Sequence, residues 1–232
     1  MKVIIAGAGI GGLTAALMLH KRGIKAEIYE QSPAVREVGV GINTLPHAIR
    51  ELAEIGLLPA LDKVGLRTRE LVYYNRQGQE VWSELRGIDA GHPVPQFSIH
   101  RGRLQKLIYD AVIERLGPDA VKTGLSLSGF IQNEGGVTAH FTDSVRGDAG
   151  TTVRGDILVC ADGIHSTARK RFYPDEGAPC WNGVLMWRGA TEWKSWRDGR
   201  TMAIGGGMGA KFVLYPIAEK GDGTQLMNWV VT

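Results

Sequence analysis

Short apolar runs and a helical pattern alternate at the start of the chain. Val3–Ala6 is apolar throughout, which predicts a buried strand, and Leu13 and Leu17 lie four residues apart in a pattern typical of a helix with one apolar face. After a break at Gly23, the alternation over Lys25–Glu30 predicts a second strand. These segments together indicate a βαβ unit at the N-terminus.

Two further helices are predicted downstream. Asn43 or Thr44 is expected to cap the first of them, which ends at Gly56. The second has apolar residues at helical spacing over Leu104–Leu116, and Gly117–Pro118 ends it.

The other apolar patterns predict strands. The period changes to two over Glu70–Trp82, around a turn at Asn75–Gly78, which is typical of a hairpin. Ile157–Cys160 predicts another buried strand. Strands are also expected over Val184–Thr191, Phe212–Pro216 and Leu226–Val231. The pattern as a whole predicts an α/β fold with a β-rich second half.

Composition narrows the class of protein. Of 232 residues, 44% are hydrophobic and 22% are charged, a balance that excludes a disordered or collagen-like chain. The formal charge is +3, and basic and acidic residues are interleaved without a basic stripe, so we expect no nucleic acid partner. No apolar run reaches about 18 residues, so we expect no membrane span. Two cysteines are too few for a disulfide framework, and we expect a cytoplasmic protein.

The glycines between the first strand and helix carry candidate chemistry. Gly7, Gly9 and Gly12 fit the pattern G-x-G-x-x-G, and Gly11 lies within the same run. In such a turn the backbone approaches a pyrophosphate, which sits on the helix N-terminus. Glu30 closes the second strand, where a carboxylate accepts hydrogen bonds from an adenosine ribose. An acid there disfavours a ribose 2′-phosphate, so the motif predicts FAD or NAD and leaves both open.

A second motif follows the predicted strand Ile157–Cys160. Asp162 and Gly163 stand at its end, with Ser166 and Arg169 shortly after. This segment resembles the Asp-Gly motif of the FAD-dependent aromatic hydroxylases, the single-component flavoprotein monooxygenases. The resemblance implies that Asp162 and Gly163 approach FAD. The alternative interpretation is an ordinary turn in which Ser166 caps a helix.

Two more segments resemble this family. Arg36–Ile42 is similar to its loop that passes the isoalloxazine ring, and His100–Leu104 is similar to its helix-opening arginine element. The resemblance implies that Arg36, Gly41 and Arg101 contact the cofactor. The two arginines could instead be solvated surface side chains.

Landmarks in the second half resemble the branch that acts on salicylate-like and phenazine carboxylate substrates. They are Met186–Gly189, Tyr215–Ile217 and Asn228–Val230. Four tryptophans also gather here, which predicts either a pocket for a flat substrate or simply core. They are Trp181, Trp187, Trp193 and Trp196.

The resemblance implies a fold and an activity. We expect a Rossmann-like FAD-binding domain at residues 1–69 and 97–175, and a partial mixed β-sheet substrate domain at 70–96 and 176–232. The implied reaction uses FAD, NADH or NADPH, and dioxygen to hydroxylate a small aromatic substrate through a flavin hydroperoxide. No catalytic acid or base can be named.

Family members continue into a third, Gly-Asp motif that this chain lacks. Because the chain stops within the apolar run Leu226–Val231, we expect a C-terminally incomplete protein. Its unfinished sheet would favour self-association. The alternative function is therefore a truncated FAD-binding fragment without monooxygenase turnover.

Competing enzyme classes lack their residues. No tyrosine is followed four residues later by lysine, which excludes a short-chain dehydrogenase. Cys160 and Cys180 are too far apart in sequence for the paired redox cysteines of a disulfide reductase, and Cys160 is expected to be an inert core thiol. The histidines never come within four residues of one another, so we expect no metal site.

Overall fold

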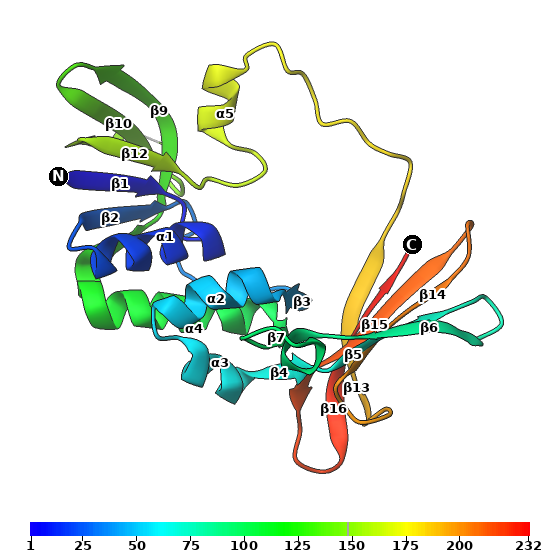
Figure 1. Ribbon diagram of the computed structural model, residues 1–232. Coiled ribbons are helices and arrows are strands. Elements are labelled where there is room, and N and C mark those ends of the chain that lie inside the picture. The colour runs from blue at the N-terminus through cyan, green and yellow to red at the C-terminus, as the bar shows by residue number, and fades with distance from the viewer. Residues whose placement is uncertain (148) are drawn as a thin grey trace. The chain divides into compact units, whose positions relative to one another are not determined.

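A computed structural model describes residues 1–147 and 149–232. Backbone contacts divide the chain into two compact units, and their elements are labelled in Figure 1. The first unit comprises Met1–Arg36 and Gln105–Pro179, and the second comprises Glu37–Leu104 and Cys180–Thr232. Residues 37–69 and 97–104, predicted to belong to the cofactor domain, fall in the second unit. The division into functional domains stays a prediction, because contacts alone do not say what each part binds.

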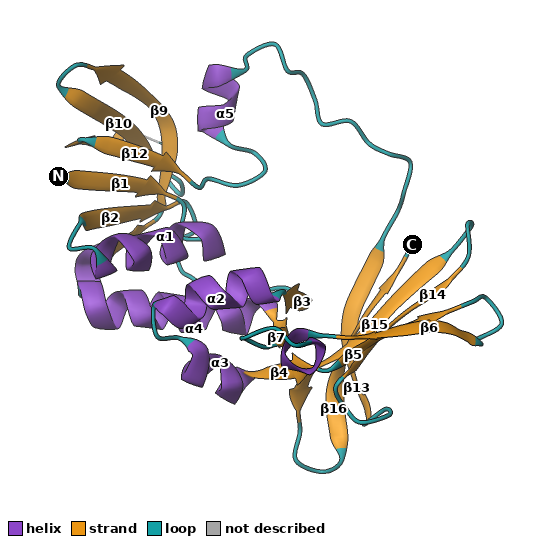
Figure 2. Ribbon diagram, in the orientation of Figure 1, coloured by secondary structure: helices purple, strands orange, loops and turns teal. Residues whose placement is uncertain are grey.

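The first unit is built on the predicted βαβ motif. β1 (Lys2–Ala6) pairs in parallel with β2 (Lys25–Glu30), and α1 (Ile10–Lys21) connects them (Figure 2). Leu13 and Leu17 on α1 are buried, as the spacing predicts. The strand order of this parallel sheet is β12-β1-β2-β8. Its outer strands are β8 (Val121–Thr123) and β12 (Ile157–Cys160).

A three-stranded antiparallel sheet, which the sequence pattern did not predict, completes the first unit. Tyr29 of the parallel sheet stacks on Phe141 of this sheet, with ring centroids 4.3 Å apart. Val137 and Ala139 are buried beside them, so the two sheets share one core. The strands are β9 (Leu125–Asn133), β10 (Gly136–Asp143) and β11 (Ala149–Gly155); the remaining elements are α4 (Arg101–Leu116), which begins in the second unit, η2 (Pro118–Ala120) and α5 (Thr167–Phe172).

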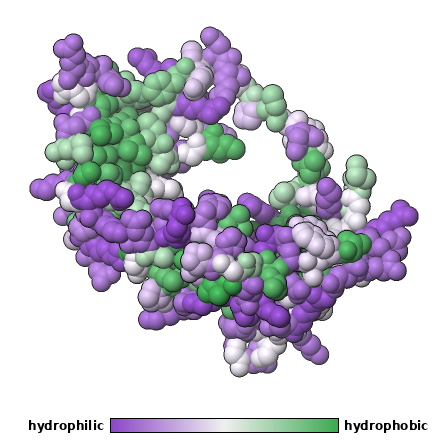
Figure 3. Space-filling model, viewed as in Figure 1, coloured by the Kyte–Doolittle hydropathy of each residue, from purple (hydrophilic) through white to green (hydrophobic). Residues whose placement is uncertain are grey.

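The predicted burial of β12 is wrong. Ile157 is 45% exposed and Cys160 is also exposed, because β12 is an outer strand with β1 as its neighbour. Figure 3 shows hydrophobic residues at the surface of the first unit, in the region of its strands. Cys160 is therefore no core thiol, although partial desolvation and the charge of Asp162 raise the pKa of its thiol.

The second unit is dominated by a six-stranded mixed sheet with the order β13-β16-β15-β14-β5-β6. β5 and β6 form the antiparallel hairpin that the sequence predicts. β14, which was not predicted, pairs in parallel with β5. The strands are β5 (Glu70–Tyr74), β6 (Glu80–Leu85), β13 (Trp187–Lys194), β14 (Thr201–Gly206), β15 (Lys211–Glu219) and β16 (Thr224–Val231).

The last strand is not the unpaired edge expected from the sequence. β16 pairs with β13 on one side and with β15 on the other. Its backbone groups are therefore satisfied within the sheet, and the outer strands are β13 and β6. The expectation that residues 226–231 form an unpaired sheet edge, from which self-association was predicted, is therefore wrong.

A smaller sheet and two helices complete the second unit. Asn43 and Thr44, expected as helix caps, belong to a strand that pairs with β7, and Leu45 occupies the N-cap position without a side-chain hydrogen bond. Pro46 opens the helix because its fixed φ suits the first helical turn. The elements are β3 (Gly41–Thr44), β4 (Gly65–Thr68), β7 (Gln96–His100), α2 (Pro46–Glu54), α3 (Leu58–Val64) and η1 (Gly87–Ala90).

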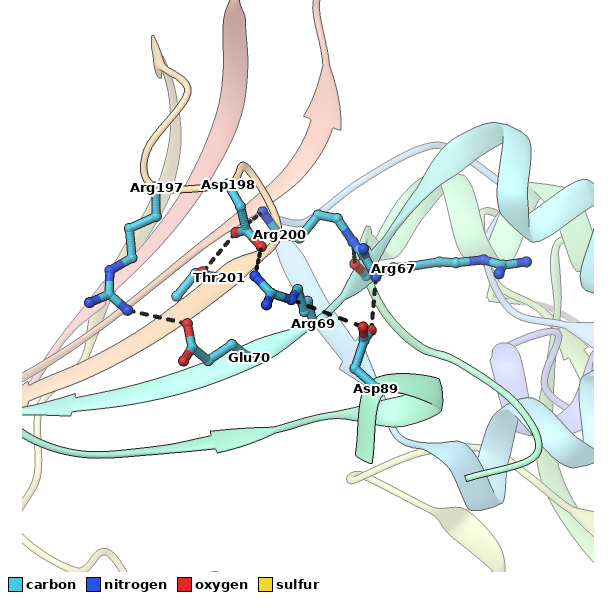
Figure 4. Close-up of polar contacts among 8 residues, drawn as sticks. All are labelled: Arg67, Arg69, Glu70, Asp89, Arg197, Asp198, Arg200 and Thr201. Atoms are coloured by element: carbon cyan, nitrogen blue, oxygen red, sulfur yellow. Dashed lines mark hydrogen bonds and ion pairs between the residues drawn. The ribbon is translucent and has the colours of Figure 1, made fainter. Parts of the chain in front are cut away.

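An ion-pair network ties β14 to the neighbouring segments (Figure 4). Arg69 donates to Asp198 at 3.0 Å, and Arg200 donates to Asp89 at 3.1 Å. The hydroxyl of Thr201, the first residue of β14, donates to Asp198 at 2.8 Å. Exposed pairs of this kind contribute little energy individually, so we interpret the network as fixing the register of β14 on β5.

No helix among the described residues combines the length and apolar character needed to cross a bilayer.

Candidate functional site

Two glycines of the first motif are required by packing. Gly7 has φ +104°, and its N–H donates to the carbonyl of Tyr29 at 2.7 Å. A Cβ at Gly7 would lie 2.3 Å from the Ala161 carbonyl oxygen, and one at Gly12 would lie 2.0 Å from the Gly7 carbonyl oxygen. Neither position accepts a side chain, so both glycines shape the turn between β1 and α1.

The other two glycines leave space in front of α1. Gly9 is the N-cap residue of α1, without a side-chain hydrogen bond to the helix, and the first turn carries no acidic residue. A Cβ at Gly9 or Gly11 would have no neighbour within 4 Å. Free N–H groups and the helix dipole favour an anion at such an end. The turn thus fits a pyrophosphate, the anionic centre of FAD.

Glu30 lies directly beside this turn. Its Oε2 accepts from the Ala8 N–H at 2.7 Å, and its Oε1 accepts from the Ser32 N–H at 2.8 Å. Each carboxylate oxygen keeps acceptor capacity, so the side chain is held in place and can still receive a hydroxyl. Gln105 of α4 donates to the Ala8 carbonyl at 2.9 Å. Gln105 stands in no motif and was not predicted as a site residue.

Asp162 and Gly163 come to the same end of the parallel sheet. β12 runs parallel to β1, and a Cβ at Gly7 would lie 3.3 Å from the Asp162 Cα. Gly163 is exposed, with φ +81° and open space around it. The two glycine-containing motifs, far apart in sequence, therefore meet at the carboxyl ends of β1 and β12.

The Asp162 carboxylate is engaged at the start of α5. Its Oδ1 accepts from the Ser166 hydroxyl and its Oδ2 from the Thr167 N–H, both at 2.7 Å. Ser166 in turn accepts from the Arg169 N–H at 2.9 Å. The alternative interpretation, a turn in which Ser166 caps a helix, thus describes the local geometry. A cofactor contact by Asp162 stays a prediction.

Arg36, the last residue of the first unit, is exposed. Within the part of the chain that the structure describes, its side chain has no hydrogen bond or ion pair. A cofactor contact by Arg36 stays a prediction.

In the second unit, Arg101 meets the segment of residues 37–41, named loop 37–41 below, whose last residue, Gly41, begins β3. The Arg101 N–H donates to the Val40 carbonyl at 2.8 Å, and the Arg101 side chain is exposed. The Gly41 N–H donates to Asn228 Oδ1 at 2.7 Å. A Cβ at Gly41 would lie 2.7 Å from both Asn228 and Tyr215. Asn228 and Tyr215 were expected as family landmarks but not as site residues.

Two residues next to Gly41, Asn228 and His100, each carry a buried polar atom without a hydrogen-bond partner among the described residues. Asn228 is 0% exposed and its Nδ2 has no hydrogen-bond partner among the described residues; nor does Nδ1 of His100, which pairs with Gly41 across β3 and β7. Burial raises the pKa of the Tyr215 phenol to about 12, against the opposing charge of Arg188. Loop 37–41 therefore packs against a polar and buried part of the mixed sheet.

The tryptophan-rich segment is not part of the hydrophobic core, which was one of its two interpretations. Trp181, Trp187 and Trp193 are exposed. A cavity of about 380 Å³ lies elsewhere in the second unit, between the start of α2, the end of β6 and residues 92–96. None of the four tryptophans lines it. The side chains that line it include His47, Arg50, Arg86, His92 and Gln96.

Comparison with known proteins identifies the family. Residues 1–178 match the family model of an FAD binding domain. The chain is 43% identical over 234 residues to the phenazine 1,6-dicarboxylic acid hydroxylase PhzS of Lysobacter antibioticus, covering 98% of this chain and 57% of that protein. It is 31% identical over 205 residues to the salicylate hydroxylase of Pseudomonas putida, covering 83% and 44%.

A solved structure has the same fold. Klebsiella pneumoniae HpxO, complexed with FAD and uric acid, superposes with a TM-score of 0.77 at 25% identity, covering 99% of this chain and 56% of that one. The chain thus spans about half the length of the relatives it matches. The FAD that the domain match specifies agrees with the open glycine turn and with Glu30 beside it. This chain belongs to the FAD-dependent aromatic hydroxylase family.

Proposed function

We propose that this chain is the FAD-binding part, with a portion of the substrate domain, of a monooxygenase that consumes NADH or NADPH and hydroxylates an aromatic substrate bearing a carboxylate. The observation that carries the proposal is the meeting of three strand ends in the first unit. The glycine turn after β1, Glu30 at the end of β2 and Asp162 after β12 share one edge of a parallel sheet. Ligands of open α/β sheets bind at this edge.

Each residue of the proposed site has a role that its surroundings allow. The turn that contains Gly9 and Gly11, shaped by Gly7 and Gly12, would hold the pyrophosphate on the N-terminus of α1. Glu30 would accept hydrogen bonds from the adenosine ribose. The remaining proposed contacts to FAD are Arg36, Gly41, Arg101, Asp162 and Gly163.

The bound flavin would supply the redox chemistry, taking a hydride from NADH or NADPH and activating dioxygen for hydroxylation of the ring. The chain's own residues would bind and orient the cofactor and keep water from the reacting atoms. No side chain is assigned as a catalytic acid or base.

The names of the relatives support the substrate class. Phenazine 1,6-dicarboxylic acid and salicylate, the compounds in two of those names, are both aromatic rings with carboxylates. We therefore propose a carboxylated aromatic compound for this chain, together with dioxygen and the nicotinamide donor as partners.

The test uses the purified 232-residue chain. Its absorption spectrum after FAD reconstitution should show protein-bound flavin bands. NADH and NADPH oxidation is then measured with and without salicylate or phenazine-1-carboxylate, and hydroxylated product is compared with hydrogen peroxide. Substrate-stimulated oxidation with hydroxylated product supports the proposal. Flavin binding without stimulated oxidation would instead identify an FAD-binding fragment without turnover.

A further inference from the structure

We propose that Asn228 is a positioning residue that couples the mixed sheet to loop 37–41. The inference rests on the proposed function, in which that loop contacts the flavin through Gly41. Asn228 lies in β16, and its Oδ1 accepts the Gly41 N–H at 2.7 Å across 187 positions of sequence. A strand of the sheet thereby fixes the backbone of the loop directly.

The burial of Asn228 indicates that this hydrogen bond is its main contribution. The residue is 0% exposed, and its Nδ2 donor has no partner among the described residues. A buried amide group without a partner costs free energy that an apolar side chain of similar size would avoid. The amide therefore packs less favourably in the core than an apolar side chain would. Its contribution is the hydrogen bond to Gly41.

Helix α4 also contacts loop 37–41. A Cβ at Gly102 would lie 2.6 Å from the backbone of Glu37, so α4 and the loop touch without an intervening side chain. The Arg101 N–H donates to Val40. Glu37, Val38 and Gly39 are exposed. The loop is thus held by α4, by Asn228 and, at Gly41, by strand pairing with His100 of β7.

Tyr215 extends this contact to the neighbouring strand. Tyr215 of β15 lies opposite Asn228 in the antiparallel register, and both side chains pack against Gly41. A change in the packing of β15 and β16 would therefore alter the contacts that hold Gly41.

The experiment compares Asn228→Leu with Met227→Leu, a volume-conserving control on the same strand. Amide hydrogen exchange of Gly41 in the FAD-free chain is measured first, and we expect faster exchange in Asn228→Leu only. FAD affinity is then measured by flavin fluorescence, with an expected loss of about 2- to 12-fold for the missing hydrogen bond. The shift of the flavin absorption bands on adding salicylate should also decrease.

Gly41→Ala tests the same contact from the loop side. Its Cβ would overlap Asn228 and Tyr215, so we expect a similar loss of FAD affinity, and this variant serves if Asn228→Leu does not fold. Folded variants with unchanged Gly41 exchange, FAD affinity and spectral shift would overturn the inference. If the wild-type chain binds no FAD, the proposed function fails, whereas the exchange of Gly41 still decides whether Asn228 anchors the loop.

Discussion

The glycines after β1 divide into two kinds at the scale of single residues. Gly7 and Gly12 lack room for a Cβ because backbone carbonyls lie against them, whereas Gly9 and Gly11 face open space. The first pair is needed for the fold, and the second pair is available to a ligand. A sequence motif alone does not separate these two requirements.

Gly9→Val should weaken FAD binding while the chain stays folded. The branched side chain would occupy the space in front of α1, and an apolar N-cap residue in place of glycine should lower the free energy of unfolding by at most about 1 kcal/mol. Gly12→Ala is the contrasting variant, because its Cβ would meet the Gly7 carbonyl, and we expect a large loss of stability. FAD titration and thermal unfolding distinguish the two. A Gly9→Val variant with wild-type FAD affinity would exclude the pyrophosphate role.

Asp162→Ala should lower both stability and FAD affinity. Loss of the acceptor at the start of α5 should reduce the free energy of unfolding by about 1 kcal/mol. Because Asp162 lies beside Gly7, we expect the loss of FAD binding energy to exceed this value. Ser166→Ala is the control, since it removes a cap of the same helix. Equal effects of Asp162→Ala on stability and binding would indicate a structural turn.

At the scale of elements, the sequence correctly predicts those helices and strands that are determined by local residue patterns. β1, α1 and β2 each carry their own period, and the glycine motif with Glu30 follows from their order. The burial of β12 was mispredicted because it depends on which strands flank it. Asn43 and Thr44 suit a helix cap, but pairing with β7 prevails. Asn228 and Gln105 were missed as site residues because their contacts form only in the folded chain.

The mixed sheet should lose stability in alkali. The folded pKa of Tyr215, raised by burial to about 12, lies above the unfolded value of about 10. Its contribution to stability is therefore complete below about pH 10 and is lost as the pH rises toward 12. Tyr29 lies in the parallel sheet of the first unit, and because its pKa is also raised, we expect that unit to lose stability in alkali as well. Urea unfolding between pH 9 and about 11.5 should show a flatter decline for Tyr215→Phe than for wild type. Parallel declines would contradict the burial of this phenol.

At the scale of the whole molecule, the residues proposed to contact FAD are divided between the two compact units. The glycine turn, Glu30 and Asp162 lie in the first unit, and Gly41 and Arg101 lie in the second. We propose that the first set contacts the adenosine half of FAD and that the second set contacts the ring. Variants in the first unit should therefore reduce FAD affinity itself, and variants around Gly41 should also change the flavin spectrum.

The most direct test of the account is an equilibrium titration of the purified chain with FAD, repeated with Glu30→Ala. Removal of the ribose acceptor should cost about 1–3 kcal/mol of binding free energy, or roughly 5- to 150-fold in affinity. Glu27→Gln is the matched control, since Glu27 lies on the same strand but bonds to Tyr29. We predict saturable binding by wild type and Glu27→Gln, and the weakened binding by Glu30→Ala. Equal FAD affinity in all three proteins, or no binding by wild type, would contradict the account.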